Sequence, residues 1–168
     1  MEKIIQKLKI RIYGDPCLCQ KAEAVKEAGI AERMLFEAMI ETMYKEKGVG
    51  LAAPQVGVNK QIFVVDVGEG PVVVVNPKVI KKSGCAVMEE GCLSVPEIVV
   101  KIKRPEKILV KYIDENNQLV EKQYSELMAR VFLHEMDHLS GKMIVDYAGW
   151  RQKFQIRKQL EELSAESI

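Results

Sequence analysis

Both histidines of this 168-residue chain lie within one pentapeptide, His134-Glu135-Met136-Asp137-His138. Side chains four residues apart on an α-helix lie on the same face, so a helix lets His134 and His138 direct ring nitrogens at one metal ion. Glu135 lies beside them, where it can handle a proton on water bound to that ion. The pentapeptide therefore predicts an inward-facing helix that carries a metal site.

The residues around the pentapeptide favour this helix. Ser125 is a suitable N-terminal cap, Glu126 suits the positive end of the helix, and Gly141 can terminate it. Leu127 and Val131 precede the histidines at helical spacing, which places the histidines on an apolar stripe. We therefore expect the metal ion to be partly buried.

Hydrophobic periodicity predicts two further helices, one N-terminal and one C-terminal. Apolar residues recur at three- and four-residue steps over residues 30–44 and again over residues 150–163. We expect the second of these helices to pack across a sheet through Trp150, Phe154, Leu160 and Leu163.

Between these helices, short β-branched segments predict antiparallel strands. The segments are residues 61–67, 72–75, 108–113 and 119–124. Asn116 and Asn117 separate the last two segments, and asparagine tolerates the positive φ angles of a tight hairpin turn. Short strands joined by a tight turn indicate an antiparallel sheet, and the length of the chain indicates a single domain over residues 1–168.

Charge and hydropathy narrow the functional classes. The formal net charge of +1 creates no field that would attract nucleic acid, so we expect no specific nucleic-acid sequence as a partner. No segment approaches the roughly 18 apolar residues of a membrane span, and residues 1–9 lack the apolar core of a signal peptide. We therefore expect a cytoplasmic protein without a membrane partner, whose four cysteines are reduced.

A catalytic site of the zinc type uses three protein ligands, so the two histidines need one more. Downstream of the helix the candidates are Asp146, Glu161 and Glu162, and a ligand there would indicate an HExxH protease. Upstream, Cys92 lies in the segment EGCLSVP, where Gly91 is expected to permit a tight turn. A thiolate held in such a stiff loop is the better candidate.

Three blocks of the sequence, taken together, are far more specific than the pentapeptide alone. They are GVGLAAPQVG at residues 48–57, EGCLSVP at residues 90–96 and HEMDH at residues 134–138. In this order and at these separations they resemble the peptide deformylase family, whose signatures have the forms GxGxAAxQ, EGCxS and HExDH. The resemblance implies an α+β fold in which antiparallel β-sheets surround a central HExDH helix, with an N-terminal helix and a C-terminal helix.

The resemblance also implies an activity. Proteins of this family are metal-dependent hydrolases that remove the N-formyl group from the N-terminal methionine of newly synthesised polypeptides and release formate. The implied ligands are Cys92, His134 and His138, and they would hold one divalent metal ion. Fe2+ is favoured, and Zn2+, Ni2+ or Co2+ are substitutes that the same donors accept.

Further roles follow from the resemblance alone. Glu135 is implied to carry a proton from water to the departing amine. The side-chain amide of Gln55 and the backbone N–H of Leu93 are implied to donate hydrogen bonds to the oxyanion that forms when water adds to the formyl carbon. The implied partner is the N-formylmethionyl nascent polypeptide, met in transient association with the ribosome in a bacterial cytoplasm. The residues implied to bind the substrate chain are Val49, Gly50 and Glu90.

Some residues lie beside the three blocks or depart from the family pattern. Arg104 is expected to brace the cysteine segment, and Asp137 to make a hydrogen bond outside the ligand set. Leu133 and Val99 replace residues common in the family.

Two alternatives stay open, an HExxH protease with a downstream ligand and a catalytically inactive metal-binding or peptide-binding relative. Structural or incidental roles are expected for Cys17, Cys19 and Cys85.

Overall fold

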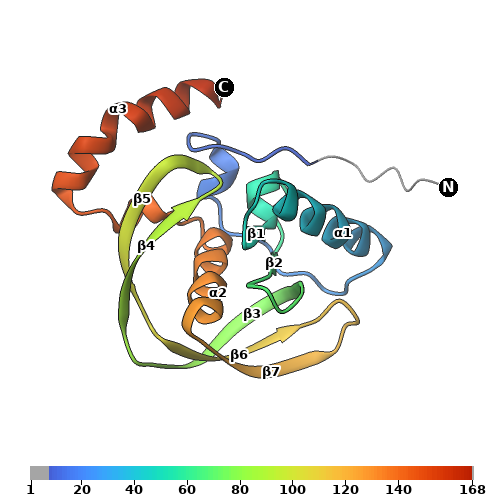
Figure 1. The fold of residues 1–168 in the computed structure, drawn as a ribbon. Coiled ribbons are helices and arrows are strands. Elements are labelled where there is room, and N and C mark those ends of the chain that lie inside the picture. The colour runs from blue at the N-terminus through green and yellow to red at the C-terminus, as the bar shows by residue number, and fades with distance from the viewer. Residues whose placement is uncertain (1–7, 168) are drawn as a thin grey trace.

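The computed structural model describes residues 8–167, which form an α+β structure as predicted (Figure 1). The helices are α1 (Ile30–Lys45), α2 (Glu126–Leu139) and α3 (Trp150–Glu166), with the short 3-10 helices η1 (Pro16–Cys19), η2 (Ala53–Val56) and η3 (Ile144–Tyr147). The strands are β1 (Gly50–Ala52), β2 (Ile62–Val65), β3 (Val72–Ser83), β4 (Ala86–Cys92), β5 (Val95–Arg104), β6 (Lys107–Ile113) and β7 (Leu119–Ser125).

Five strands form one antiparallel sheet in the order β1-β2-β3-β6-β7, and β4 pairs with β5 in a second, antiparallel sheet. The predicted strands appear as β2, β3, β6 and β7, although β3 continues to Ser83. Between β6 and β7 only Asn117 has a positive φ, of 61°, so the turn is looser than the expected two-asparagine turn. Strands β1, β4 and β5 were not predicted.

The five-stranded sheet is covered on both faces. Phe63 and Val65 of β2 belong to the apolar cluster that contains Phe132 of α2. Ile62 and Val64, which alternate with them, belong to the cluster that contains residues of α1. Because both faces are buried, β2 is apolar at every position, unlike a strand with one face in water.

Helix α2 lies between the five-stranded sheet and the β4–β5 hairpin (Figure 1). Its buried side includes Ala129 and Phe132, which pack toward the larger sheet. The hairpin has its own cluster, in which Ile98, Val100 and Ile102 of β5 lie with Ile144 of η3 and the preceding Met143. The helix that carries the pentapeptide therefore contacts the larger sheet on one side and faces the hairpin on the other.

The N-terminal end of α2 differs from expectation, and its C-terminal end agrees with it. Ser125 occupies the N-cap position, but its side chain makes no capping hydrogen bond. The backbone N–H of Glu126 donates instead to the carbonyl of Glu106 at 2.8 Å, in the connection between β5 and β6. Gly141 ends the helix as predicted: its φ is 71°, and a β-carbon there would lie 2.6 Å from the carbonyl oxygen of Cys19.

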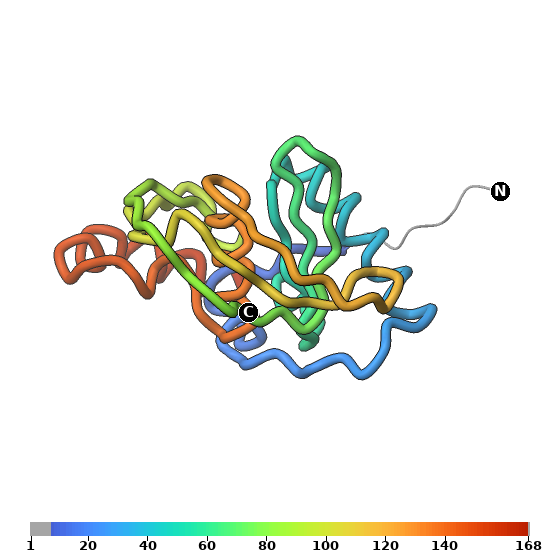
Figure 2. The backbone as a smooth tube through the Cα atoms, turned by 90° about the horizontal axis from the view of Figure 1, so that it is seen from below, coloured from blue at the N-terminus to red at the C-terminus, as the bar shows by residue number. Residues whose placement is uncertain are grey.

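Helix α3 corrects one expectation, because Trp150 and Phe154 do not pack across a sheet. Their side chains are 75% and 77% exposed, whereas Ile156 is buried. Leu160 and Leu163 follow Ile156 at steps of four and three residues and pack partly against the hairpin cluster, so Phe154, two residues before Ile156, faces away. Figures 1 and 2 place α3 and α1 at opposite ends of the molecule.

None of the helices within residues 8–167 is long and apolar enough to cross a bilayer.

Candidate metal centre

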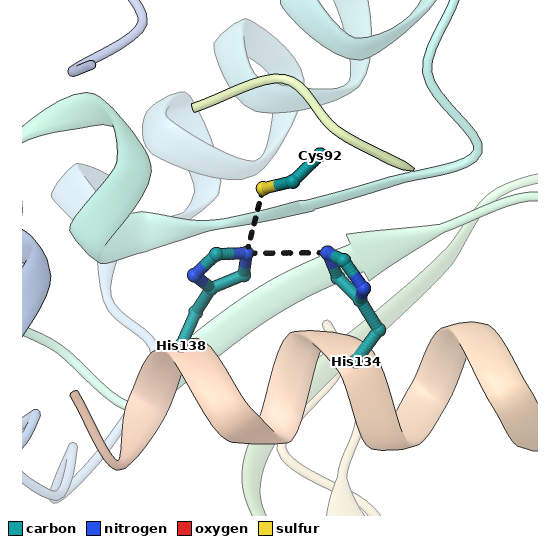
Figure 3. Close-up of side chains that lie close together, drawn as sticks. All are labelled: Cys92, His134 and His138. Carbon is teal, nitrogen blue, oxygen red and sulfur yellow. Dashed lines mark hydrogen bonds between the residues drawn. The ribbon is translucent and has the colours of Figure 1, made fainter. Parts of the chain in front are cut away.

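Three side chains that can bind metal meet between α2 and the hairpin. Cys92 ends β4, and His134 and His138 lie one turn apart on α2. The Nε2 atom of His138 lies 3.3 Å from the Sγ atom of Cys92 and 3.3 Å from the Nε2 atom of His134 (Figure 3). All three donor atoms lie within 4.8 Å of one another. Two imidazole nitrogens and a thiolate directed at one point fit a divalent metal ion.

The backbone around Cys92 is a strand end and a tight turn, which differs from the expected loop. It is the last residue of β4 and pairs with Val95 across a two-residue turn. Gly91 does not form that turn: it lies within β4, where the pairing register shifts between Glu90 and Cys92. Irregularities of this kind in a strand re-aim a side chain.

No downstream carboxylate joins the group within residues 8–167. The side chain of Asp146 accepts a hydrogen bond from the backbone N–H of Met143 at 2.8 Å. Glu161 pairs with Arg157 at 2.8 Å on α3, and Glu162 is also exposed on α3. The protease alternative therefore lacks its third ligand.

Glu135 is buried beside the ligands, with only 3% of its surface exposed. Its Oε2 atom has no hydrogen-bond partner among the described residues. Burial opposes the charged form and raises the pKa of Glu135 to about 7. The carboxyl group can therefore both accept and return a proton near neutral pH.

Two glycines of the first block make room for the site. A β-carbon on Gly50 would overlap Oε1 of Glu135 and lie 2.9 Å from Cγ1 of Val131. A β-carbon on Gly48 would lie 2.9 Å from Cδ1 of Leu93. Glycine at position 50 thus allows β1 to approach the carboxyl group of Glu135, a requirement separate from the substrate contact that the resemblance implies.

The amide of Gln55 is held in one orientation. The side chain is 1% exposed on η2, and its Oε1 atom accepts the backbone N–H of Ala52 at 2.8 Å. Its Nε2 atom donates to Oγ of Ser94 at 3.2 Å and lies 3.6 Å from Sγ of Cys92. The donor end of the amide therefore faces the metal ligands. Sequence reasoning missed Ser94, although it lies in the EGCLSVP segment.

The carboxylate of Glu90 is fully engaged by three side chains. Arg104 donates to Oε1 at 2.6 Å and to Oε2 at 2.9 Å, and Arg130 donates to Oε1 at 2.7 Å. Nδ1 of His134 lies 3.0 Å from Oε2. Burial alone would raise the pKa of Glu90, but the hydrogen bonds from His134 and Arg104 bring it to about 2. Glu90 lines the cleft, but its carboxylate oxygens point into this network.

Arg104 and Asp137 occupy the expected supporting positions. Arg104 is 5% exposed, so it is not a solvated surface arginine. Besides Glu90 it binds Asp137 at 2.9 Å, and the hydroxyl of Tyr147 donates to the same carboxylate oxygen at 2.9 Å. Asp137 thus ties the end of α2 to β5 and η3 from outside the ligand set.

The pKa values of the two histidines are shifted in opposite directions. Burial lowers the pKa of His138 well below its usual value, which favours the neutral ring. Burial also opposes a charge on His134, but hydrogen bonds to Cys92 and Glu90 raise its pKa well above the usual value. A cation that binds here must displace that proton, because only neutral imidazole is a ligand.

Two of the three ligands, Cys92 and His134, line a cleft of about 420 Å³. Its lining includes Gln55, Leu93 and Glu135 close to the ligands. The walls of the cleft are mainly apolar and include Val49 just before β1, Met88 of β4, and Leu127 and Val131 of α2. The cleft can therefore hold a bound molecule that has an apolar side chain along α2 and a carbonyl group beside the metal ligands.

The remaining residues singled out in the sequence lie outside the cleft. Leu133 packs in the core beside Phe132, and Val99 is exposed on β5. Cys17 donates to the carbonyl of Pro54 at 3.4 Å, and burial raises its pKa to about 12. All four cysteines are free thiols: Cys17, Cys19, Cys85 and Cys92.

Comparisons with known proteins agree with the three blocks. The family model described as polypeptide deformylase matches residues 7–154. The chain is 43% identical to the peptide deformylase of Thermotoga neapolitana over 93% of its own length and 96% of that protein. The crystal structure of the Thermotoga maritima peptide deformylase superposes with a TM-score of 0.82 at 47% identity, covering 84% of this chain and 97% of the other. For the Thermus thermophilus enzyme the TM-score is 0.89 at 37% identity, covering 95% and 98%.

Proposed function

The chain belongs to the polypeptide deformylase family, and we propose that the cleft between β1, the β4–β5 hairpin and α2 is where it performs that family's reaction. The protein is a metal-dependent hydrolase that removes the N-formyl group from the N-terminal methionine of newly synthesised polypeptides and releases formate. The observation that carries the proposed site is the convergence of Cys92, His134 and His138 on one point beside Glu135.

Cys92, His134 and His138 are the proposed ligands of one divalent metal ion. The resemblance favours Fe2+, and the same donors also suit Zn2+, Ni2+ and Co2+. When bound, such an ion polarises a carbonyl oxygen and lowers the pKa of a water molecule from about 15.7 to about 7. The metal content of protein purified without oxygen identifies the ion.

Glu135 is the proposed proton carrier. It accepts a proton from the attacking water and returns it to the amine nitrogen as the bond between that nitrogen and the formyl carbon breaks. The products are formate and a free N-terminal amine. A pKa of about 7, which burial produces, supports both steps at neutral pH.

Gln55 and Leu93 are the proposed donors to the oxyanion that forms when water adds to the formyl carbon. The amide of Gln55 needs no reorientation, because Ala52 already holds its oxygen and leaves its nitrogen directed at the ligands. The backbone of Leu93 follows Cys92 directly and lines the same cleft. Donors held in advance stabilise charge at little reorganisation cost.

The substrate chain is proposed to lie along β1. This strand is at the edge of the five-stranded sheet, so it pairs with β2 on one side only and can accept an extended peptide on the other. Val49 and Gly50 would bind the peptide, and Glu90 would contribute at most through its backbone, because its carboxylate is engaged. The methionine side chain fits the apolar walls made by Val49, Met88, Leu127 and Val131.

We expect the protein, loaded with ferrous iron under anaerobic conditions, to release formate from a formyl-methionyl tripeptide. The same peptide with an acetyl group in place of the formyl group is the control, because its extra methyl group must fit beside the ligands. Formate is measured by a coupled dehydrogenase assay. An iron-loaded protein that releases no formate would overturn the proposed function.

Replacing Gln55 with alanine should raise the activation barrier by about 3–4 kcal/mol, because one prepositioned oxyanion donor is lost. The loss should appear in kcat for formate release. Gln61→Ala is the matched control: its amide donates to the carbonyl of Ala22, away from the cleft. Equal kcat values for the two variants would exclude Gln55 from the reaction.

We also propose a bacterial cytoplasmic location and transient association with the ribosome. Formylated N termini are present on chains still being made, and this property of the substrate is what supports the proposal. Cosedimentation of the protein with translating ribosomes, compared with ribosomes stripped of nascent chains, tests the association.

A further inference from the structure

We propose that Arg130 is a positioning residue for the metal ligand His134, and that it acts through Glu90. This inference rests on the proposed function, because it assumes that His134 binds the ion. Arg130 lies on α2 one turn before His134 and is 5% exposed. None of the sequence patterns singled it out.

Arg130 joins α2 to both strands of the hairpin that ends in Cys92. Its NH1 atom donates to Oε1 of Glu90 at 2.7 Å and to the carbonyl of Ile102 on β5 at 3.0 Å. Its NH2 atom donates to the carbonyl of Ala86, at the start of β4, at 2.8 Å. One buried guanidinium therefore connects the helix of the two histidine ligands with the strand of the cysteine ligand.

The contacts of Glu90 show why one arginine is not enough. A carboxylate has about four acceptor positions, two on each oxygen. Oε1 is bonded by Arg104 and Arg130, and Oε2 by Arg104 and His134. Without Arg130, Oε1 would lose one of its two donors in a buried place, and of the two arginines only Arg104, bound to both oxygens, would still hold the carboxylate. The carboxylate would then shift together with the Arg104 side chain, and the oxygen that binds His134 would move with it.

The orientation of His134 matters for the ion. A carboxylate that accepts Nδ1–H of a histidine ligand fixes the tautomer and the ring orientation, so that Nε2 presents its lone pair to the metal. Substitution of such supporting partners typically lowers metal affinity by about 10- to 100-fold. Arg130 holds the supporting carboxylate, so we place its effect in the same range.

The test is cobalt affinity, measured by chelator competition, together with the visible absorption of the cobalt-loaded protein, which reports ligand geometry. Arg130→Met keeps most of the packing volume and removes the head group, so affinity should fall about 10- to 100-fold and the absorption bands should shift. Arg130→Lys keeps a charge near Glu90 and should recover part of the loss, and it replaces the first variant if that one fails to fold. Arg33→Met, at an exposed position of α1, should bind cobalt like the parent.

A second experiment, in protein that carries Glu90→Gln, separates the proposed role of Arg130 from a purely structural one. If Arg130 acts through Glu90, Arg130→Met should have little further effect on cobalt affinity in protein that already carries Glu90→Gln. An equal loss in both backgrounds, or an affinity within twofold of the parent in the single variant, would overturn the proposal. Formate release is scored separately: a protein that binds cobalt as expected yet releases no formate overturns the proposed function and not the role of Arg130.

Discussion

Replacing Glu135 with glutamine should lower kcat by about 10²- to 10⁴-fold while the protein keeps its metal ion. Glutamine has the shape of glutamate, but it cannot accept a proton from water or return one to an amine. Glu135 is not one of the three converging donors, so the ion should be retained. Metal content and formate release measured on the same preparation separate the two effects. A rate close to that of the parent would refute the proposed role of Glu135.

Stability provides the control for this variant. Burial raises the pKa of Glu135 from 4.5 to about 7 in the folded protein, so ionisation of this group destabilises the metal-free fold. That cost is absent below pH 4.5, grows as pH rises to about 7 and is constant above it. Metal-free Glu135→Gln should therefore melt no lower than the parent at pH 8, and its advantage should shrink at pH 5. Glu41→Gln, at an exposed position inside helix α1, should change neither kcat nor the melting temperature appreciably.

The helix that carries the pentapeptide could be predicted from the sequence because local rules determine it. His134 and His138 share a face with Leu127 and Val131 at any register of a regular helix, and Gly141 marks the end. The strand pair β6–β7 was predictable for the same reason, since short β-branched segments flank a turn. These elements depend on neighbours in the sequence.

The hairpin that presents Cys92 was missed, although half of it has a clear pattern. In β5, Ile98, Val100 and Ile102 alternate with exposed residues, and Arg104 continues the same inward series. Strand β4 offers no such pattern, because Val87 and Met88 are exposed and the buried position is Glu90. Its pairing with β5 depends on tertiary contacts, which override the weak strand preference of its own residues.

The supporting network around the ligands was the least predictable part of the site. Glu90 lies 14 residues from Arg104, 40 from Arg130 and 44 from His134 in the sequence. Glutamate and arginine, taken alone, are more often found at a protein surface. Their burial becomes favourable only when charges and hydrogen bonds are matched in space, and sequence spacing does not reveal that match.

Replacing Cys92 with alanine should weaken metal binding by more than the roughly 100-fold that marks the upper end for supporting contacts, because a direct ligand is lost. Formate release should disappear with the ion. Two imidazoles on one helix would remain, and no carboxylate within residues 8–167 is placed to replace the thiolate. Metal content after dialysis against a weak chelator and residual formate release are the measurements.

The matched control is Cys17→Ala. Cys17 is partly buried like Cys92, but its thiol donates to the carbonyl of Pro54 and it lies outside the ligand group. It should lose some packing and retain both metal and activity.

The comparison of the two variants also distinguishes the two kinds of HExxH enzyme. A protease with a downstream carboxylate ligand would keep its ion when Cys92 is removed, whereas a site completed by the thiolate cannot. Full metal occupancy and full activity in Cys92→Ala would therefore contradict the ligand set proposed for this protein.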